Sequence, residues 1–165
     1  MVKKVYTALG DSGFTSDFSG QRVLKNSSMI IANGKIDTLQ SAIDYSLLLD
    51  NGVHKTILNK VQQKLWQTAG EIANCPGECI NTPINLQDLE DLEIYIESLG
   101  EPPNKFVRFN TKEAISFNEC RIKCRDLEIS LVNLLKDKSL RGEIYQYVNR
   151  LSSLFFMLGY KYSKT

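Results

Sequence analysis

Residues 120–134 read CRIKCRDLEISLVNL, and this stretch decides the fold. Its apolar residues recur every three or four positions: Cys120, Cys124, Leu127, Leu131 and Leu134. That spacing matches the 3.6 residues of each α-helical turn, so these side chains fall on one face. The stretch therefore predicts a long amphipathic helix with one buried stripe.

The same period extends outward in both directions. It predicts helices over 28–49 and about 53–73, a shorter one that ends at Gly100, the one containing 120–134, and a last one after Ser139, a suitable N-cap. Breakers separate them: Asn51-Gly52, Cys75-Pro76-Gly77, Gly100 before Pro102-Pro103, and Asp137-Lys138-Ser139. Five helices with mostly short connections predict an all-α, up-and-down bundle.

The first 28 residues differ in composition from the rest. They are rich in Gly, Ser, Thr and Asp and show no helical period, so they predict an ordered loop or short hairpin. A chain of 165 residues with 42% hydrophobic content is long enough for one packed core. We therefore expect a single domain over 1–165, with a loop at 1–28 and a helical bundle at 29–165.

Charge and hydropathy exclude several classes of function. Twenty basic and nineteen acidic residues give a net charge of +1, which does not indicate a nucleic-acid partner. The longest apolar runs, such as 46–49 and 154–158, are too short to span a membrane. No apolar stretch of a signal peptide follows the basic residues at the start, so a cytoplasmic location is expected.

Four cysteines form two pairs of Cys-x-x-x-Cys spacing, Cys75/Cys79 and Cys120/Cys124. One interpretation is a four-cysteine zinc site. The second pair, however, lies on the apolar stripe of a predicted helix, where cysteine is usually a buried hydrophobic residue. We therefore expect core and loop thiols and no protein metal site.

The N-terminal loop contains the string Thr7-Ala8-Leu9-Gly10-Asp11-Ser12-Gly13-Phe14-Thr15-Ser16. Two closely spaced glycines let backbone N–H groups turn inward, and hydroxyls add donors, which is typical of a phosphate-binding loop or of a simple turn. The segment Gly10-Asp11-Ser12-Gly13 also matches the nucleophile string of trypsin-like proteases. That class needs a histidine upstream of the serine, whereas the single histidine, His54, lies downstream.

Beside the apolar stripe of 120–134, Arg121, Arg125 and Glu128 form a polar stripe. These arginines either bind an anion next to the core or belong to a solvated face with an Arg125–Glu128 helix pair. Two further polar residues stand next to core positions. Asn149 precedes Leu151 on the last helix, and Asp37 follows Ile36 on the first, where a half-buried carboxylate would need a cationic partner.

Taken together, several blocks resemble the corrinoid adenosyltransferase family of the propanediol-utilisation type, in that family's order. The blocks are Val5-Tyr6-Thr7-x-x-Gly10-Asp11-x-Gly13-x-Thr15-Ser16, Gly20-x-Arg22-Val23-x-Lys25, Gly34-x-x-Asp37-x-Leu39-x-Ser41-Ala42, Phe106-Val107, Cys120-Arg121-x-x-Cys124-Arg125-x-x-Glu128, and Tyr147-Val148-Asn149-Arg150-Leu151-Ser152 followed by Leu154-Phe155.

The resemblance implies an enzyme that transfers the 5′-deoxyadenosyl group of ATP to the cobalt of reduced cobalamin or a related corrinoid. It implies a homotrimer with active sites between subunits, Mg²⁺ carried by ATP, and a corrinoid reductase as a possible partner. Asp37 would pair with Arg121 across the interface, and Phe106 would press on the lower face of the corrin. The implied ATP-binding residues are Thr7, Gly10, Thr15, Ser16, Lys25, Arg125, Glu128 and Asn149.

Some positions depart from the family pattern. Ala8, Asp126 and Ile129 stand where the family usually has basic residues, and Ser153 replaces an Asp. Fewer positive charges near a triphosphate are expected to weaken ATP binding, by about 1–2 kcal/mol for each missing charged hydrogen bond to phosphate. Two alternatives therefore remain beside a divergent enzyme: a non-catalytic carrier or regulator that binds ATP or corrinoid, and a helical scaffold without a small ligand.

Overall fold

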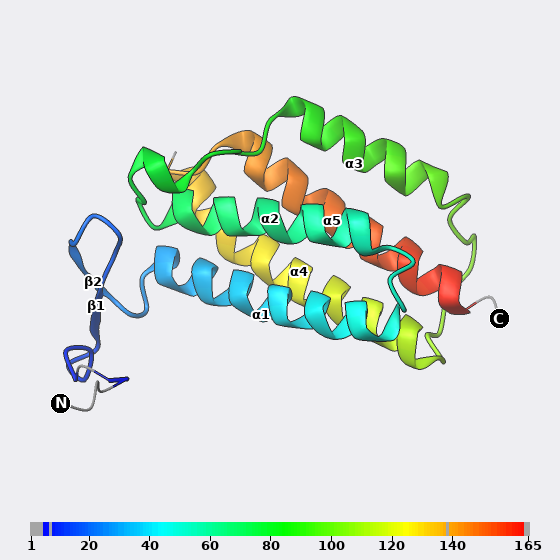
Figure 1. Cartoon of the computed structure of the whole chain (residues 1–165), viewed down its shortest axis with the longest axis horizontal. Coiled ribbons are helices and arrows are strands. Elements are labelled where there is room, and N and C mark those ends of the chain that lie inside the picture. The colour runs from blue at the N-terminus through cyan, green and yellow to red at the C-terminus, as the bar shows by residue number, and fades with distance from the viewer. Residues whose placement is uncertain (1–4, 7, 138, 164–165) are drawn as a thin grey trace.

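The computed structural model describes residues 5–6, 8–137 and 139–163. Within them the chain forms a short antiparallel hairpin followed by an all-α bundle (Figure 1). The strands are β1 (Phe14–Ser16) and β2 (Arg22–Leu24). The helices are α1 (Ser28–Leu49), α2 (Lys55–Ile72), the 3₁₀ turn η1 (Gly77–Cys79), α3 (Leu86–Ser98), α4 (Lys112–Lys136) and α5 (Gly142–Ser163).

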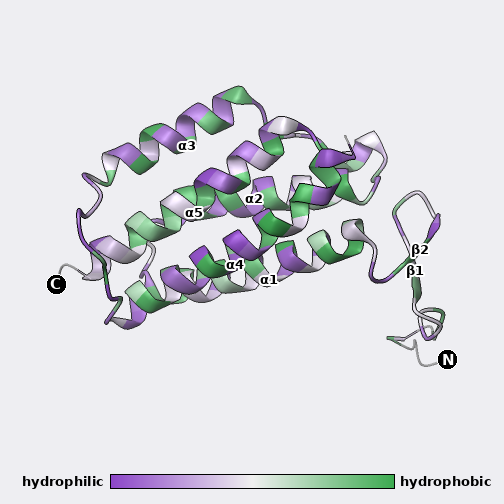
Figure 2. Ribbon diagram, turned by 180° about the vertical axis from the view of Figure 1, so that it is seen from behind, coloured by the Kyte–Doolittle hydropathy of each residue, from purple (hydrophilic) through white to green (hydrophobic). Residues whose placement is uncertain are grey.

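Helix α4 lies in the middle of the bundle, where it packs most extensively on α1 and α5. Helix α2 packs on α1, and α3 packs on α5. Successive helices run in alternating directions, up and down the bundle (Figure 1). The apolar stripe of 120–134 is buried as predicted, and hydrophobic and hydrophilic residues alternate along the helices (Figure 2). The five-helix bundle is confirmed for the described residues. None of the described helices combines the length and apolar content needed to cross a membrane.

Local chemistry explains where the helices begin and end. Asn51 and Gly52 adopt left-handed φ angles of 51° and 81°, which stop α1 at the expected place. Asp50 then accepts a hydrogen bond from the His54 amide at 2.6 Å, so α2 begins two residues later than predicted. Ser139 is not an N-cap, because its hydroxyl donates to the Leu134 carbonyl at 3.0 Å and therefore completes the end of α4.

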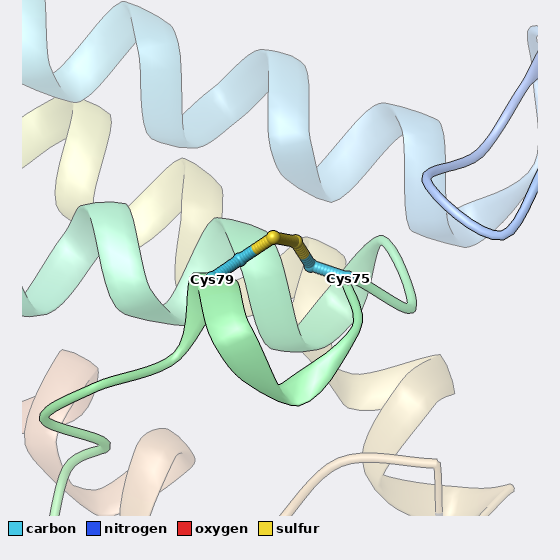
Figure 3. Close-up of a disulfide and its surroundings, with 2 residues drawn as sticks. All are labelled: Cys75 and Cys79. Atoms are coloured by element: carbon cyan, nitrogen blue, oxygen red, sulfur yellow. A yellow bond between two sulfur atoms is a disulfide. The ribbon is translucent and has the colours of Figure 1, made fainter.

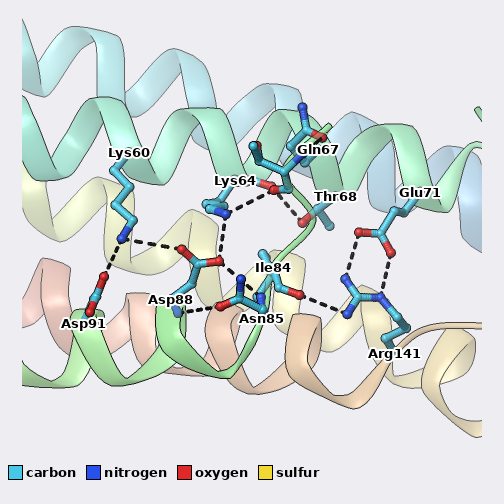
Figure 4. A network of polar contacts seen from close by, with 11 residues as sticks. Lys60, Lys64, Gln67, Thr68, Glu71, Ile84, Asn85, Asp88, Asp91 and Arg141 are labelled. Atoms are coloured by element: carbon cyan, nitrogen blue, oxygen red, sulfur yellow. Dashed lines mark hydrogen bonds and ion pairs between the residues drawn. The ribbon is translucent and has the colours of Figure 1, made fainter. Parts of the chain in front are cut away.

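A polar network fastens α3 and the start of α5 to α2 (Figure 4). The buried Lys64 ammonium lies 2.7 Å from the Asp88 carboxylate, and Asp88 also closes a capping box with Asn85. At the other end, Arg141 makes paired contacts of 2.8 and 2.9 Å with Glu71. Since the Lys64 and Asp88 charges are both buried, each compensates the desolvation of the other.

The N-terminal segment forms the predicted short hairpin. Thr15 pairs with Val23, and the hairpin projects past the first turn of α1, away from the body of the bundle (Figures 1 and 2). Thr7, one of the predicted phosphate-binding residues, lies outside the described residues. Gly10, Thr15, Ser16 and Lys25 are described.

The two cysteine pairs differ in their oxidation state. Cys120 and Cys124 are fully buried thiols in the core, as predicted, and burial raises the pKa of Cys120 to about 12. The prediction of a loop thiol pair at Cys75 and Cys79 is wrong, because these residues form a disulfide after α2 (Figure 3). The 3₁₀ turn between them brings residues four apart close enough to bond.

Candidate active site

The hairpin brings a cation against a glycine. A Cβ placed on Gly10 would lie 2.9 Å from Lys25 Nζ, so the Lys25 ammonium lies close against the backbone of Gly10. The Lys25 amide donates to the Gly13 carbonyl at 2.9 Å, and Gly13 itself has a φ of 82° that favours glycine. Arg22 donates to the Leu9 carbonyl at 3.1 Å and shapes the same turn. A lysine held over a glycine-rich turn is suited to an anionic group.

On α4, the polar stripe opens onto a groove of about 430 Å³. Arg121 and Arg125 line this groove together with apolar residues of α5 such as Phe156 and Met157. Asn118 accepts a hydrogen bond from Arg121 Nε at 2.9 Å and so orients one of the two guanidinium groups. Two arginines over a partly apolar floor can bind an anion more strongly than they would in free water.

The third residue of the stripe, Glu128, belongs to a network that joins three helices. Asn149 Nδ2 donates to Glu128 at 2.8 Å, and Arg150 Nη1 donates to the Asn149 side-chain oxygen at 3.2 Å. Arg150 Nε also donates to Glu93 of α3 at 2.7 Å. The alternative of an Arg125–Glu128 helix pair is not what Glu128 forms, since its partners are Asn149 and Tyr145.

Tyr145 donates to the Glu128 carboxylate at 3.4 Å. Burial, followed by the charge of Glu128, raises the pKa of Tyr145, which keeps its phenol protonated and able to donate. The network therefore holds the carboxylate with two neutral donors and leaves Arg125, an exposed side chain, directed to the groove.

A second groove, of about 490 Å³, adjoins the first. Phe106 lines it, and Arg121 and Phe156 stand between the two grooves because they line both. The Phe106 side chain is 96% exposed, on the connection between α3 and α4. An almost fully exposed aromatic ring, beside a groove lined by both apolar and basic side chains, offers a flat contact surface for a large ring ligand.

Asp37 lies elsewhere. It is an exposed residue of α1, and it lines a groove of about 480 Å³ with Glu119 and Lys123, which face away from Arg121 on α4. The expectation of a half-buried Asp37 is therefore wrong for the single chain. The described residues include no hydrogen bond or ion pair between Asp37 and Arg121 within one chain.

The predicted site residues thus fall into separate groups within one chain. The structure brings Arg121, Arg125 and Phe106 to adjoining grooves, and it joins Glu128 to Asn149. The hairpin with Gly10 and Lys25 projects from the end of the bundle, away from the middle of α4 (Figure 1). Within one chain, the hairpin and the α4 groove are therefore two separate groups of predicted site residues.

The positions that depart from the family pattern have partners of their own. Asp126 forms an ion pair with Lys35 of α1, so its charge is partly neutralised within the bundle. Ile129 is 69% exposed, and Ser153 lies in the groove with the two arginines. Ala8 adopts a φ of 58°, an uncommon conformation for a residue with a side chain.

Sequence reasoning missed three contributors to these contacts. Asn118 precedes Arg121 by one helical turn, so its spacing could have indicated it. Tyr145 precedes Asn149 by one turn on α5 and could have been found in the same way. Glu93 comes from α3, and no pattern in the chain connects it to Arg150 in advance.

Comparison with known proteins places these features in a family. The family described as cobalamin adenosyltransferase matches residues 5–162. A cobalamin adenosyltransferase from Cupriavidus metallidurans is 33% identical over 161 residues, covering 95% of this chain and 86% of that protein. The corrinoid adenosyltransferase PduO of Salmonella typhimurium is 30% identical over 93% of this chain, which spans only 48% of that protein.

Solved structures agree on the fold. A variant PduO-type ATP:corrinoid adenosyltransferase from Lactobacillus reuteri, complexed with cobalamin and ATP, superposes with a TM-score of 0.83 at 24% identity. The match covers 98% of this chain and 95% of that one. With the match over residues 5–162, these similarities show that the chain belongs to the cobalamin adenosyltransferase family.

Proposed function

We propose that this chain transfers the 5′-deoxyadenosyl group of ATP to the cobalt of a reduced corrinoid, releasing triphosphate. The observation that carries the proposal is the pair of adjoining grooves joined by Arg121, one lined by Arg125 and the other by Phe106. Family membership supports the same activity, since relatives that match over most of this chain are named cobalamin adenosyltransferase or corrinoid adenosyltransferase.

The chemistry needs geometry and charge more than it needs an acid or a base. Cobalt(I) supplies an electron pair to C5′ of the ribose, a cobalt–carbon bond forms, and the C5′–oxygen bond to triphosphate breaks. Electrons and atoms balance without proton transfer. The protein must align cobalt with C5′ and stabilise the charge that develops on the leaving triphosphate.

In this proposal the hairpin binds the phosphates of ATP through Gly10, Thr15, Ser16 and Lys25, with Thr7. Arg125, Glu128 and Asn149 complete the nucleotide site from α4 and α5. The position of Lys25 over Gly10 supports the phosphate role. The hydrogen bond from Asn149 to Glu128 supports a preorganised arrangement of the part of the nucleotide site on α4 and α5.

Mg²⁺ is proposed to arrive with the phosphates of ATP. The possible magnesium ligands in residues 10–16 are hydroxyls such as those of Thr15 and Ser16 and the single carboxylate of Asp11, and magnesium commonly takes one or two protein ligands while phosphates and water supply the rest. The residues of the hairpin therefore fit a nucleotide-borne ion better than a site built from side chains. When bound, the ion would neutralise charge on the leaving triphosphate.

The two halves of the site are proposed to meet in a homotrimer, with Asp37 of one copy paired to Arg121 of the next. An apolar stripe on α4 supports this assembly: Ile115, Ile122 and Ile129, seven residues apart, are 54%, 48% and 69% exposed. Exposed apolar side chains in line on one helix are typical of a covered interface. Ile122 and Ile129 also line a groove with Arg121, so a copy seated there would reach this arginine.

Phe106 is proposed to contact the lower face of the corrin and keep an axial ligand off cobalt. A cobalt(II) centre without that ligand is easier to reduce, by a corrinoid reductase or a chemical reductant. The almost complete exposure of Phe106, beside a groove lined by both apolar and basic side chains, supports this role. A cytoplasmic location belongs to the same proposal.

An anaerobic absorbance assay tests the proposal. Chemically reduced cob(I)alamin and Mg-ATP are mixed with the protein, and we expect the cobalt(I) band to be replaced by the adenosylcobalamin spectrum. The matched control is the Arg125→Ala variant, which should lose at least about 100-fold in rate because a charge-stabilising donor is removed.

Two other results would count against an enzyme. Binding of ATP or corrinoid without conversion would favour a carrier, which the ion-paired Asp126 and the apolar Ile129 make the second candidate. No binding and no conversion would leave a scaffold. A full rate in Arg125→Ala would remove this arginine from the site.

A further inference from the structure

The turn of the hairpin is attached to the bundle at the end of α2. The Phe18 amide donates to the Ala73 carbonyl at 3.1 Å, and Asn74 Nδ2 donates to Asp17 Oδ2 at 3.1 Å. These hydrogen bonds join the turn between β1 and β2 to residues much further along the chain. The opposite end of the hairpin carries Gly10 and Lys25.

Asp17 organises this turn with both carboxylate oxygens. Oδ1 accepts from the Ser19 hydroxyl at 2.7 Å and from the Gln21 amide at 2.9 Å, while Oδ2 is used by Asn74. The side chain is buried, and the hydrogen bonds from Ser19 and Asn74 hold its pKa below the ordinary value, so the carboxylate is ionised at neutral pH. One residue therefore shapes the turn and connects it to α2.

Asn74 is placed for this contact by its backbone. Its φ of 56° is left-handed, a conformation that asparagine tolerates better than most residues with a side chain. Its amide donates to the Glu71 carbonyl at 3.3 Å, and its side chain also approaches Met29 Sδ in the first turn of α1 at 3.9 Å. Asn74 thus lies between the hairpin, α1 and α2.

The disulfide braces the segment that carries Asn74. Cys75 follows directly, its amide donates to the Gly70 carbonyl at 2.9 Å, and its sulfur is bonded to Cys79 (Figure 3). Phe18 and both cysteines line one cavity of about 420 Å³. The attachment point of the hairpin is consequently a cross-linked turn and not a free loop.

We propose that Asp17 and Asn74 are positioning residues that set the affinity for ATP by fixing the direction of the hairpin. The inference rests on the proposed function, in which the hairpin holds the phosphates. Neither residue touches the nucleotide; they act through Gly10 and Lys25 at the far end. A hairpin of three-residue strands has little stability of its own, so its attachment decides where the phosphate donors lie.

The test exchanges the two partners. Asp17→Asn keeps an oxygen for Ser19 and Gln21 but places an NH₂ group opposite the NH₂ of Asn74, which breaks the bond between hairpin and bundle. Asn74→Asp removes the donor. The double variant Asp17→Asn/Asn74→Asp restores one hydrogen bond in the reverse direction. Glu78→Gln, an exposed change in the same loop, is the control.

Binding of Mg-ATP by calorimetry and the KM values for ATP and corrinoid are measured on the full chain. We expect the Kd and KM for ATP to rise about tenfold in each single variant, with kcat and the corrinoid KM little changed, and to recover in the double variant. Hydrogen exchange at Val23 should also quicken in the single variants and slow again in the double variant, without ATP.

Several outcomes would overturn the inference. One is an unchanged Kd for Mg-ATP in both single variants. Another is a fall in kcat and a rise in the corrinoid KM as large as the change in the KM for ATP. A third is a double variant whose Kd for Mg-ATP is as high as in the single variants. Wild-type protein that binds Mg-ATP without turnover would refute the proposed enzyme while leaving the positioning effect to be decided by the Kd values. Wild-type protein that does not bind Mg-ATP would overturn both.

Discussion

Asn149 of α5 donates a hydrogen bond of 2.8 Å to Glu128 of α4, and this contact fixes the carboxylate next to the two-arginine groove. Without this donor, only the longer contact of 3.4 Å from Tyr145 would hold Glu128, and the carboxylate could turn toward Arg125 and neutralise it. The pair therefore keeps the guanidinium of Arg125 available for a ligand.

Replacing Asn149 by Ala is expected to lower adenosyl transfer from ATP by about 10- to 100-fold, because a hydrogen bond to a charged group is removed. Initial rates with cob(I)alamin measure the effect. Asn133→Ala, an exposed position on α4, is the control and should retain its rate. Rates in Asn149→Ala equal to those of the control would show that the Glu128 contact has no part in catalysis.

Replacing Phe106 by Ala should affect the two starting oxidation states differently. The ring is proposed to exclude an axial ligand, which matters for reduction of cobalt(II) and much less once cobalt(I) is present. We expect a loss of at least about tenfold in the assay that starts from cob(II)alamin and a reductant, and a smaller loss from pre-reduced cob(I)alamin. Phe106→Trp keeps a large ring and should retain activity. Equal losses from both starting states would contradict the role.

The ion pair of Asp126 with Lys35 allows the effect of Asp126, which stands where the family usually has a basic residue, on ATP binding to be measured. The pair is partly exposed, so Asp126→Asn should change the free energy of unfolding by less than about 1 kcal/mol. The same change should tighten Mg-ATP binding by less than about fivefold, since Lys35 already offsets much of the charge. Lys35→Met breaks the same pair but leaves the carboxylate, and calorimetry should show weaker ATP binding. Weaker binding in Asp126→Asn, or tighter binding in Lys35→Met, would refute this account.

A buried histidine should make stability fall in mild acid. His54 is 5% exposed, and its Nδ1 lies 2.7 Å from the Tyr95 hydroxyl. Burial lowers the pKa of His54 below its ordinary value of 6.5, although Asp50 opposes this, and Lys161 adds to the lowering. Since the unfolded chain then takes up the proton more readily, the contribution to stability is complete above pH 6.5 and is lost as the pH falls through the lower folded value.

Urea denaturation at about pH 7.5 and about pH 5.5, on either side of the ordinary histidine pKa, checks this prediction. The midpoint should fall at the lower pH for the wild-type protein, and the difference between the two pH values should shrink in His54→Asn. A difference of the same size in the variant would place the acid sensitivity in other groups.

Much of the bundle could be predicted because its helices carry their own local information. Leu127 and Leu131 mark the buried face of α4 by spacing alone, and Asn51-Gly52 ends α1 by backbone conformation. Errors arose where a residue from elsewhere decides the outcome. Ser139 completes α4 instead of starting α5, and the turn from Pro76 to Cys79 brings two sulfurs together.

In the candidate site, too, the residues that local spacing groups together could be predicted, and those that depend on distant partners could not. Arg121 and Arg125 could be assigned to one stripe from helical spacing, and the structure places both in one groove. The partner of Asp126 could not be assigned, because Lys35 lies far earlier in the chain and meets it only when α1 packs on α4. The roles proposed for Asp37 and the hairpin would depend on a second copy of the chain, and no spacing within one sequence can specify such a contact.

Lys25 belongs to the projecting hairpin and Arg125 to the α4 groove, and this separation would allow two inactive variants to complement each other. If each site combines the hairpin of one chain with the α4 groove of its neighbour, Lys25→Ala and Arg125→Ala damage opposite halves. Mixed oligomers of the two inactive variants would then contain sites with both halves intact. We expect co-expression to restore part of the activity that neither variant has alone, whereas two variants of the same half would not complement each other.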